Sequence, residues 1–423
     1  MKIAVVGAGI AGNVAASRLA GAHEITVFEA GSHAGGHSHT HDLEIAGRRV
    51  AVDTGFIVYN ERTYPRFTAL LAGLGVATQE SRMSFSVRDE AADLEYNGTS
   101  LNALFAQRRN LLKPSFLGMV RDILRFHREA PRLLVQPGPE LPLGRFLEEG
   151  RYGQAFREHY ILPMGAAIWS TTPASMFQFP ARFFVRFLHN HGMLTVDDRP
   201  VWRTVTGGSA RYVDRLVAPF RHRIRLGTPV ESVRRLPGAV IVKPRGQEAE
   251  RFDAVFLACH ADQALRLLAD PSVAEQEVLG AIPFQRNEAV LHTDARLLPR
   301  RPLAHAAWNY HVLPGGQGPV ALTYHMNILQ QLDLPVPLLV TLNRTEAIDP
   351  AQVLARMSYE HPLFTPRSVA AQARHREVNG ALRTYYCGAW WRNGFHEDGV
   401  VSAEEAVAHF EWDHAERALH RSA

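Results

Sequence analysis

The chain has 423 residues, a formal net charge of +4, and 46% hydrophobic residues. This length exceeds what one hydrophobic core usually organises, so we expect two lobes. The composition is that of an ordinary globular protein and excludes a disordered or fibrous chain. Its only cysteines, Cys259 and Cys387, exclude a disulfide scaffold and a cysteine-rich metal site, and they fit a reducing cytoplasm.

The hydropathy pattern gives the expected location. The N-terminal apolar run covers only Ile3 to Val6 before glycines interrupt it, and no signal-peptide cleavage site follows. No apolar stretch approaches the ~18–20 residues that a membrane span needs. We therefore expect a cytoplasmic protein that is soluble or peripheral at the inner membrane face. The small net charge establishes no partner by itself, and we expect no nucleic-acid partner.

A strand, a glycine-rich turn and a helix open the chain. Residues 2–6 are an apolar run rich in β-branched side chains, typical of a buried parallel strand, and residues 13–20 are expected to form a helix. The turn between them reads Gly7-Ala8-Gly9-Ile10-Ala11-Gly12. A helix that begins at such a turn directs free N–H groups and the positive end of its dipole toward phosphates.

The glycines of the turn and the acid that follows have separate roles in this interpretation. Gly7 permits the tight turn, Gly9 lets a pyrophosphate approach the backbone, and Gly12 lets helix and strand pack closely. A second apolar strand, residues 24–28, ends at Glu29, where a carboxylate can accept both ribose hydroxyls. The unit predicts a dinucleotide site but does not by itself separate NAD from FAD.

The next residues carry a resemblance to a known family. The segment reads Ala30-Gly31-Ser32-His33-Ala34-Gly35-Gly36-His37. A glutamate-ended strand followed by a Gly-Gly pair resembles the entry of the flavin-containing amine oxidase and phytoene desaturase superfamily. The resemblance implies FAD as the cofactor. The family usually has arginine where this chain has His37, so a cationic contact to the pyrophosphate is not implied here.

Later segments resemble the same family in the same order along the chain. Residues 52–56 resemble the segment close to the flavin ring, and residues 206–208 resemble the turn that returns from the cap lobe. Residues 229–233 resemble a strand on the adenine side, and residues 252–259 a strand of the FAD sheet. The implied cofactor contacts are Gly7, Gly9, Ile10, Ala11, Gly12, Glu29, Ala30, Gly35, Gly36, His37, Thr54, Gly55, Phe56, Val230, Ala258, Gly388, Gly399, Val400 and Val401.

The C-terminal block resembles the last strand and turn of the family. We expect a turn over 394–402 and then a helix over 401–419, whose N-terminus would stabilise negative charge on a reduced flavin. His396 and Glu397 lie in this turn and are the candidates for acid–base catalysis. The alternative is that Glu397 and Asp398 cap the helix.

The whole-chain resemblance implies an α/β fold, with a glutathione-reductase-like FAD-binding Rossmann domain and an inserted mixed α+β substrate, or cap, domain. We assign residues 1–80, 206–268 and 383–423 to the FAD-binding domain, and 81–205 and 269–382 to the cap. Within the second insertion we expect strands at 289–291 and 320–324 and a helix near 349–358.

One subgroup of the family fits especially well. Its bacterial members carry GGHSHT and VDTGFIVYNERTYP near the start and GFHEDG near the end, as this chain does. They are predicted NAD/FAD-binding proteins associated with cyclopropane-fatty-acid-synthase-like enzymes and lipid acyl modification. This resemblance implies an apolar or acyl-lipid substrate that loses hydride to flavin N5, by desaturation or a related oxidation.

The route of the electrons stays open in part. No second GxGxxG follows a strand, because Gly315-Gly316-Gln317-Gly318 lies between prolines and reads as a loop, and no CxxxxC occurs. The chain therefore lacks the parts of a pyridine-nucleotide disulfide reductase. Oxygen, a quinone and another protein remain open as electron acceptors.

Three other functions stay open. Many family members that oxidise amines place a lysine near flavin N5, and none of Lys2, Lys113 and Lys243 is well placed for that, so oxidation of a C–N bond ranks second. A non-catalytic flavoprotein partner of a lipid-modifying enzyme is another alternative. Isomerisation without net redox change is the third.

Two further patterns have competing interpretations. Residues 105–132 hold seven basic residues and two acids, and we expect Phe116, Leu117, Val120, Ile123 and Leu124 on one helical face with Arg121, Arg125 and Arg128 opposite. This is either an amphipathic helix for an anionic membrane or a cap helix with a solvated arginine face.

His37, His39 and His41 alternate as metal ligands on a strand could, but without a matching carboxylate or cysteine cluster we expect no metal.

Overall fold

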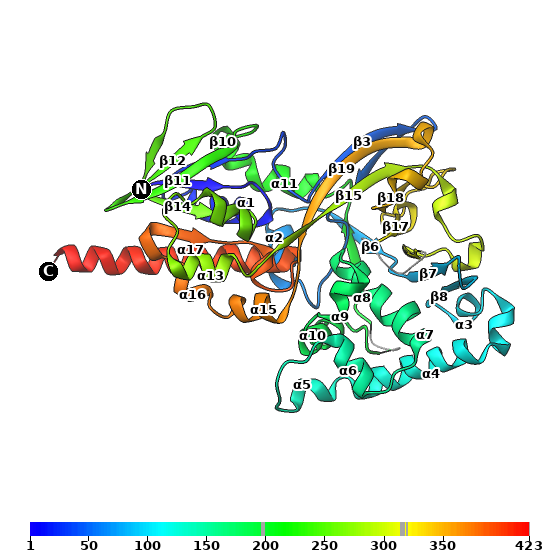
Figure 1. Ribbon diagram of the computed structural model, residues 1–423. Coiled ribbons are helices and arrows are strands. Elements are labelled where there is room, and N and C mark those ends of the chain that lie inside the picture. The colour runs from blue at the N-terminus through cyan, green and yellow to red at the C-terminus, as the bar shows by residue number, and fades with distance from the viewer. Residues whose placement is uncertain (196–198, 314–317, 319, 423) are drawn as a thin grey trace.

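The computed structural model has two lobes side by side (Figure 1). It describes residues 1–195, 199–313, 318 and 320–422. The left-hand lobe in Figure 1 is built on a parallel sheet and the right-hand lobe on a mixed sheet with helices at one end. This is the α/β fold with a Rossmann-type domain and a second, mixed domain that the sequence predicted.

A five-stranded sheet organises the first lobe. The strand order is β10-β2-β1-β14-β20, and every pair is parallel. The bounds are β1 Lys2–Val6, β2 Glu24–Phe28, β10 Ile224–Arg225, β14 Ala254–Leu257 and β20 Thr384–Tyr386. Strands from residues 1–80, 206–268 and 383–423 therefore meet in one sheet.

The side chains of β1 point alternately to the two faces of this sheet. Ile3 and Val5 are buried against α1 (Ile10–Leu19), α11 (Ala210–Val217) and α17 (His396–Ser422). Ala4 and Val6 face the opposite core, which contains the small sheet β11 (Val230–Leu236), β12 (Ala239–Pro244) and β13 (Glu250–Phe252), with α12 (Ala261–Leu267) and α13 (Val273–Leu279). Burial on both faces explains why the strand is continuously apolar.

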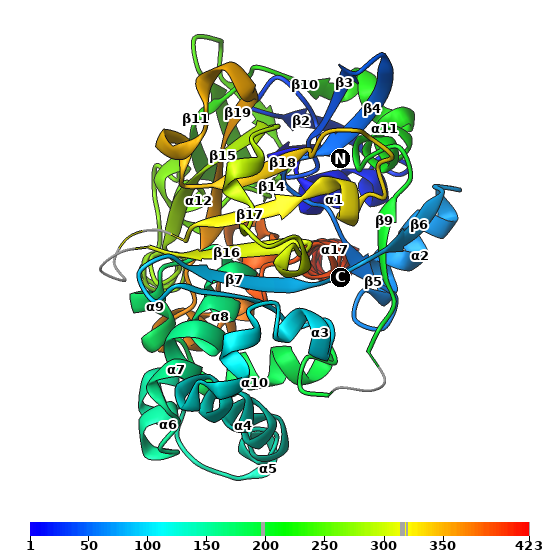
Figure 2. The ribbon, with the colours of Figure 1, turned by 90° about the vertical axis from the view of Figure 1, so that its right-hand side faces the viewer.

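A seven-stranded sheet organises the second lobe, in the order β19-β15-β18-β17-β16-β7-β8. The bounds are β7 Phe85–Asp89, β8 Leu94–Asn97, β15 Phe284–His292, β16 Trp308–Val312, β17 Leu322–His325, β18 Leu339–Leu342 and β19 Val353–Pro362. Its strands come from residues 81–205 and 269–382. Figure 2 shows the helices of this lobe below the sheet.

The helices of the second lobe come mainly from one stretch of chain. They are α3 Leu101–Leu104, α4 Pro114–Glu129, α5 Arg132–Val135, α6 Leu143–Glu149, α7 Gln154–Phe156, α8 Leu162–Trp169, α9 Pro173–Phe177, α10 Ala181–Asn190 and α14 Met326–Leu329. Aromatic and aliphatic side chains of these helices share one hydrophobic core with the seven-stranded sheet. Among the described residues, no helix combines the length and the apolar character needed to cross a bilayer.

The remaining elements connect the lobes or cover the first one. They are β3 Thr40–Ile45, β4 Arg48–Asp53, β5 Tyr59–Asn60, α2 Pro65–Gly73, β6 Thr78–Ser81, β9 Trp202–Val205, α15 Pro366–Gln372 and α16 His375–Val378. β9 pairs with both β5 and β6, so the chain leaves and re-enters the first lobe at one place. The predicted turn after β9 is present, with Gly207 at φ +76° and Gly208 at φ +91°.

The structure corrects one predicted element. The helix expected near 349–358 is wrong: a short 3-10 turn covers Pro350–Gln352, and β19 follows. β19 pairs antiparallel with β15 along its length, and this pairing overrides the helix propensity of Leu354, Ala355 and Met357. The strands expected at 289–291 and 320–324 correspond to β15 and β17, whereas Gly315–Gln317 of the predicted loop lie outside the described residues.

A buried ion pair joins β11 to α13 beneath the parallel sheet. The Arg235 side chain is fully buried and donates two hydrogen bonds to the carboxylate of Glu275, at 2.7 and 2.9 Å. It also donates to the Asp270 carboxylate at 2.7 Å. Removing one partner of such a pair leaves a buried charge without compensation.

We predict that Arg235→Ala lowers the free energy of unfolding by about 3–5 kcal/mol. The matched control is Arg145→Ala, because the Arg145–Glu149 pair is exposed at the protein surface. The control should lose no more than about 1 kcal/mol. Urea unfolding of the two variants measures the difference, and equal losses would contradict this assignment.

Candidate active site

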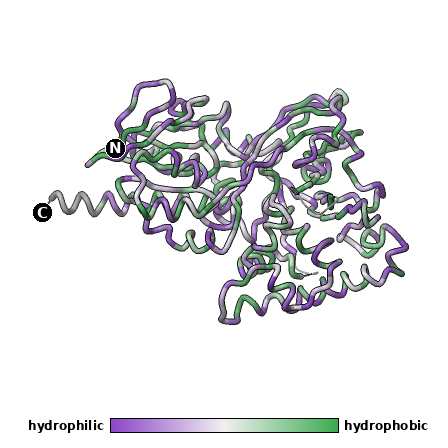
Figure 3. The backbone as a smooth tube through the Cα atoms, viewed as in Figure 1, coloured by the Kyte–Doolittle hydropathy of each residue, from purple (hydrophilic) through white to green (hydrophobic). Residues whose placement is uncertain are grey.

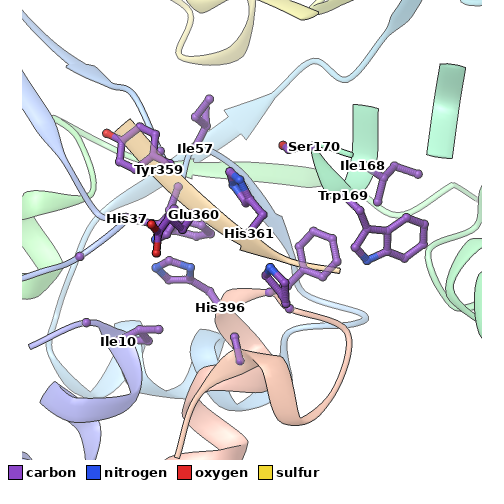
Figure 4. Close-up of a pocket in the computed structure, with 18 of the residues that line it drawn as sticks. Ile10, His37, Ile57, Ile168, Trp169, Ser170, Tyr359, Glu360, His361 and His396 are labelled. Carbon is purple, nitrogen blue, oxygen red and sulfur yellow. The ribbon is translucent and has the colours of Figure 1, made fainter. Parts of the chain in front are cut away.

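A cavity of ≈ 1290 Å³ lies between the two lobes. Its walls include the β1–α1 turn and Glu29 at one end and helices of the second lobe, with Met164 and Phe187, at the other. Figure 4 shows side chains from both lobes facing this space. Ligand sites commonly measure ~300–1,000 Å³, so this cavity has room for more than one small molecule.

The β1–α1 turn forms the first end of the cavity. Gly7 has φ +104°, and its N–H donates to the Phe28 carbonyl at 2.8 Å. A Cβ on Gly12 would lie 1.9 Å from the Gly7 carbonyl oxygen, so only glycine permits this contact. A Cβ on Gly9 would meet nothing within 4 Å. Gly12 therefore serves packing, whereas Gly9 leaves open space at the cavity wall.

Backbone N–H groups hold the Glu29 carboxylate in place. One oxygen accepts from Ala8 N–H and the other from Gly31 N–H, both at 2.7 Å. Each carboxylate oxygen can accept more than one hydrogen bond, so both retain acceptor capacity. Glu29 also lines the cavity. It is fixed in orientation and can still accept ribose hydroxyls.

Most of the predicted cofactor contacts lie in the cavity walls. They are Gly7, Gly9, Ile10, Ala11, Glu29, Ala30, Gly35, Gly36, His37, Gly55, Phe56, Val230, Ala258 and Gly388. These residues come from segments far apart in the sequence, and Glu29, Gly35 and Ala258 lie directly against the turn after β1. A Cβ on Gly36, which has φ +59°, would lie 3.1 Å from Gly9 Cα.

Five predicted contacts lie behind the walls instead. Gly12 packs on Gly7, and the Thr54 hydroxyl hydrogen-bonds Tyr359 OH at 2.7 Å. Gly399, Val400 and Val401 lie within α17, because that helix begins at His396 rather than at Val401. Val400 is fully buried in the core, and a Cβ on Gly399 would lie 2.7 Å from the Ile10 side chain. These residues support the wall rather than form it.

His396 is the first residue of α17 and lines the cavity (Figure 4). Its ring stacks on Phe56 with centroids 3.5 Å apart. Its Nε2 lies 2.9 Å from Ser38 Oγ and 3.0 Å from Tyr212 OH. Burial lowers the pKa of His396 to about 3. The neutral ring is therefore suited to hydrogen bonding and is a weak base at neutral pH.

Glu397 occupies a different position from the one expected. Its carboxylate accepts from Arg66 N–H at 3.1 Å and Phe67 N–H at 2.8 Å, in the first turn of α2. It is therefore a cap for a neighbouring helix and does not line the cavity. A catalytic role for Glu397 does not fit this geometry. Asp398 accepts from Phe395 N–H at 2.9 Å and caps α17. The alternative interpretation therefore holds for Asp398 but not for Glu397, which caps α2 instead.

Three cavity residues on β19 were not predicted from the sequence. Tyr359, Glu360 and His361 all line the cavity, and Figure 4 shows them on one strand opposite His37 and His396. The ring of His37 lies 5.0 Å from Tyr359 and 5.3 Å from His361. The alternation of Tyr359 and His361 is the sequence signal of a strand that could have revealed them.

The histidines of residues 37–41 face in different directions. His37 precedes β3 and turns toward β19, whereas the His39 ring lies 4.3 Å from both His33 and His41. Burial lowers the pKa of His37 well below its usual range. The described residues contain no group of three or more His, Cys, Asp or Glu side chains suited to a metal ion.

The lysines, all within described residues, lie outside the cavity walls. Lys2 pairs with Glu250, and Lys243 pairs with Glu231. Lys113 directly precedes α4. The walls that the second lobe, here also called the substrate lobe, contributes are instead mainly apolar and aromatic, with Met83, Phe85, Met164, Ile168, Trp169, Phe187 and Met193.

Comparison with known proteins decides the family. Residues 10–302, more than half of the chain, match the family model described as flavin containing amine oxidoreductase. The chain belongs to this family. It is an FAD-dependent oxidoreductase with the amine-oxidase-like fold, as the sequence predicted.

Solved structures share this fold along nearly the whole chain. Cyclohexylamine oxidase from Brevibacterium oxydans IH-35A is 14% identical, with 97% of this chain and 98% of that chain covered and a TM-score of 0.71. Putrescine oxidase bound to putrescine is 14% identical, with 96% and 98% covered and a TM-score of 0.69. A CLA-producing fatty acid isomerase from P. acnes is 16% identical, with 96% and 98% covered and a TM-score of 0.67.

The residues at the first end of the cavity fit FAD. The N-terminus of α1 and the open space at Gly9 suit a pyrophosphate, and the Glu29 carboxylate suits a ribose. The N-terminus of α17 adjoins the wall at His396, where a negative flavin edge would be stabilised.

We predict that Gly9→Glu gives a folded protein that retains no FAD. The added carboxylate would enter the open space at the wall and repel the pyrophosphate. Gly12→Ala should instead destabilise the fold, because its Cβ would overlap the Gly7 carbonyl. The flavin content of the purified variants and the thermal unfolding of their apoproteins separate the two effects. A yellow, fully loaded Gly9→Glu variant would overturn the assignment of this end.

Proposed function

We propose that this oxidoreductase acts on an apolar substrate with a fatty acyl chain, by desaturation or a related oxidation. The single observation that carries the proposal is the apolar, aromatic wall at the substrate-lobe end of the cavity, with Met164, Ile168 and Phe187. Methylene groups gain free energy when they leave water for such a wall. Bound FAD supplies the hydride acceptor.

The protein's own residues define how a chain would be held. Trp169 packs among Phe179 at 4.5 Å and Phe187 at 4.8 Å, and its Nε1 donates to the Asn393 carbonyl at 3.1 Å. The indole is thus fixed from two sides and forms a rigid wall. Such a wall excludes water and orients an alkyl chain without needing a polar contact along it.

Oxidation of an amine is the second candidate, and family membership favours it. Two of the structural neighbours are amine oxidases by name, and one is a fatty acid isomerase. Trp390 and Phe395 both line the cavity, but Trp390 packs on Trp391 at 4.3 Å, and Phe395 stacks on Phe187 at 5.0 Å. These partners give no support to a cage of two facing rings made by Trp390 and Phe395.

Anaerobic reduction tests the candidates directly. We predict that long-chain acyl lipids bleach the yellow colour of the FAD-loaded protein and that a panel of amines does not. Bleaching by amines alone would replace the acyl proposal with the amine candidate. If no compound of either class bleaches the flavin, a non-catalytic or isomerase role would be favoured instead.

A variant in the wall tests the position of the substrate. Ile168→Asp would place a carboxylate against the alkyl chain, so kcat/KM for an acyl substrate should fall at least about tenfold, a loss of about 1.4 kcal/mol. The matched control is Leu303→Asp, since Leu303 is exposed and outside the cavity walls. FAD content should be normal in both variants. An unchanged kcat/KM in Ile168→Asp would contradict the placement.

A further inference from the structure

The exposed face of α4 carries leucines and arginines in alternation. Leu117, Arg121, Leu124 and Arg128 are all exposed, and their spacing of four, three and four residues places them on one side of the helix. The buried side consists of Phe116, Met119, Asp122 and Phe126. The predicted separation of leucines from arginines is therefore wrong, because Phe116, Met119 and Phe126 turn α4 so that Leu117 and Leu124 face outward.

Arg125 does not belong to this exposed face. Its guanidinium lies 4.0 Å from the Tyr152 ring centre and donates to the Gly150 carbonyl at 2.8 Å. It also pairs with the buried carboxylate of Asp122 at 3.3 Å. Arg125 thus holds α4 onto its own lobe, and only Arg121 and Arg128 accompany the leucines.

Exposed apolar side chains gather around this helix. Six of the large hydrophobic residues that the described structure exposes fall within residues 101–135: Leu101, Leu111, Leu112, Leu117, Leu124 and Val135. Leu112 is 87% exposed and Leu101 is 77% exposed. We call these six residues, with Arg121 and Arg128, the docking surface. Isolated exposed leucines are normal in proteins, but six of the fourteen exposed large hydrophobic residues among those described fall in this one stretch, which favours an interaction site.

The charge around the docking surface is positive. Residues 105–132 hold seven basic residues and two acids. One acid, Asp122, is buried, and the other, Glu129, lies 3.2 Å from Arg128. In the ranges that the structure describes, no ion pair within 4.0 Å involves Lys113, Arg121 or Arg132.

The docking surface lies beside an opening of the cavity. Gly98 and Thr99 are exposed, line the cavity, and directly precede the turn into α3 that contains Leu101. Val201 also lines the cavity and is 58% exposed, and His127 contributes to the wall from α4 itself. Figure 1 shows α4 along the outer edge of the second lobe, with α3 near one end of this helix and α5 near the other.

We propose that the docking surface rests on an anionic lipid bilayer, with its leucines among the acyl chains and its arginines at the phosphates. Arginine stems can lie along apolar surface while the guanidinium reaches the headgroups, so alternation with leucine suits a membrane interface. The tube in Figure 3 alternates between hydrophobic and hydrophilic residues along α4. The purpose of docking, delivery of an acyl chain to the opening, rests on the proposed function.

Co-sedimentation of the FAD-loaded protein with vesicles, without turnover, tests this proposal. We expect binding to vesicles of equal parts phosphatidylcholine and phosphatidylglycerol, and much weaker binding to phosphatidylcholine alone. High salt should weaken the binding. The double variants L112E/L124E and R121E/R128E should each bind the anionic vesicles at least about tenfold less tightly.

Matched substitutions elsewhere serve as controls. L236E/L354E and R145E/R234E change exposed residues outside residues 101–135 and should bind as the parent does. Thermal unfolding and flavin content confirm that each variant is folded. Parent protein that stays unbound, or docking variants that bind like the controls, would overturn the proposal. Self-association that the docking variants abolish, without vesicle binding, would assign the surface to a second copy of the chain instead.

The vesicle experiment is separable from the test of function. If the unmodified protein binds vesicles but no acyl lipid bleaches its flavin, the proposed docking surface is supported and the proposed substrate is contradicted. If acyl lipids bleach the flavin of the unmodified protein but it does not bind anionic vesicles, the proposed substrate is supported and the docking surface is contradicted.

Discussion

Close contact between backbone segments shapes the cofactor end of the cavity. Gly12 lets α1 begin directly against the carbonyl of Gly7. Gly36 lets the loop between β2 and β3 pass close to Gly9. A side chain on Gly12 would separate helix from strand, and with them the N–H groups that suit a pyrophosphate. The position of Glu29, which is hydrogen-bonded to Ala8 in the same turn, depends on this contact as well.

The second constraint is the pair of long strands β15 and β19, which crosses from one lobe to the other in Figure 1. This pair places Tyr359 and His361 against His37 of the first lobe, and Thr54 reaches the hydroxyl of Tyr359. Burial lowers the pKa of His361 to about 4 and keeps it neutral at ordinary pH. The two lobes thus meet through the aromatic and imidazole rings of His37, Tyr359 and His361. The carboxylate of Glu360 lies on the same strand, 3.0 Å from His260 Nδ1.

The parts of the fold that could be predicted from sequence are those with a strong local pattern. β1 and β2 have the predicted bounds because strands buried on both faces are continuously apolar. The glycine turn and Glu29 could be recognised because their spacing is itself the requirement for binding a dinucleotide. The strand β14 and the turn at Gly207 and Gly208 followed from resemblance and order along the chain.

The remaining errors have physical causes in tertiary packing. β19 contains good helix formers and becomes a strand only because β15 offers it a partner. α17 begins before the predicted residue because Asp398 caps it through Phe395 N–H, and Glu397 is drawn to α2 instead of the cavity. The local sequence did not predict which side of α4 would be buried, because both of its faces contain large apolar residues.

We propose that one continuous cavity holds FAD at its glycine end and an acyl chain at the end formed by the second lobe. The most direct measurement is a crystal structure of the FAD-loaded protein grown with a long-chain fatty acid. We expect the dinucleotide along Gly9 and Glu29, and the acyl chain against Met164, Ile168 and Phe187. An acyl chain bound outside these walls, or FAD bound away from the glycine turn, would contradict the claim.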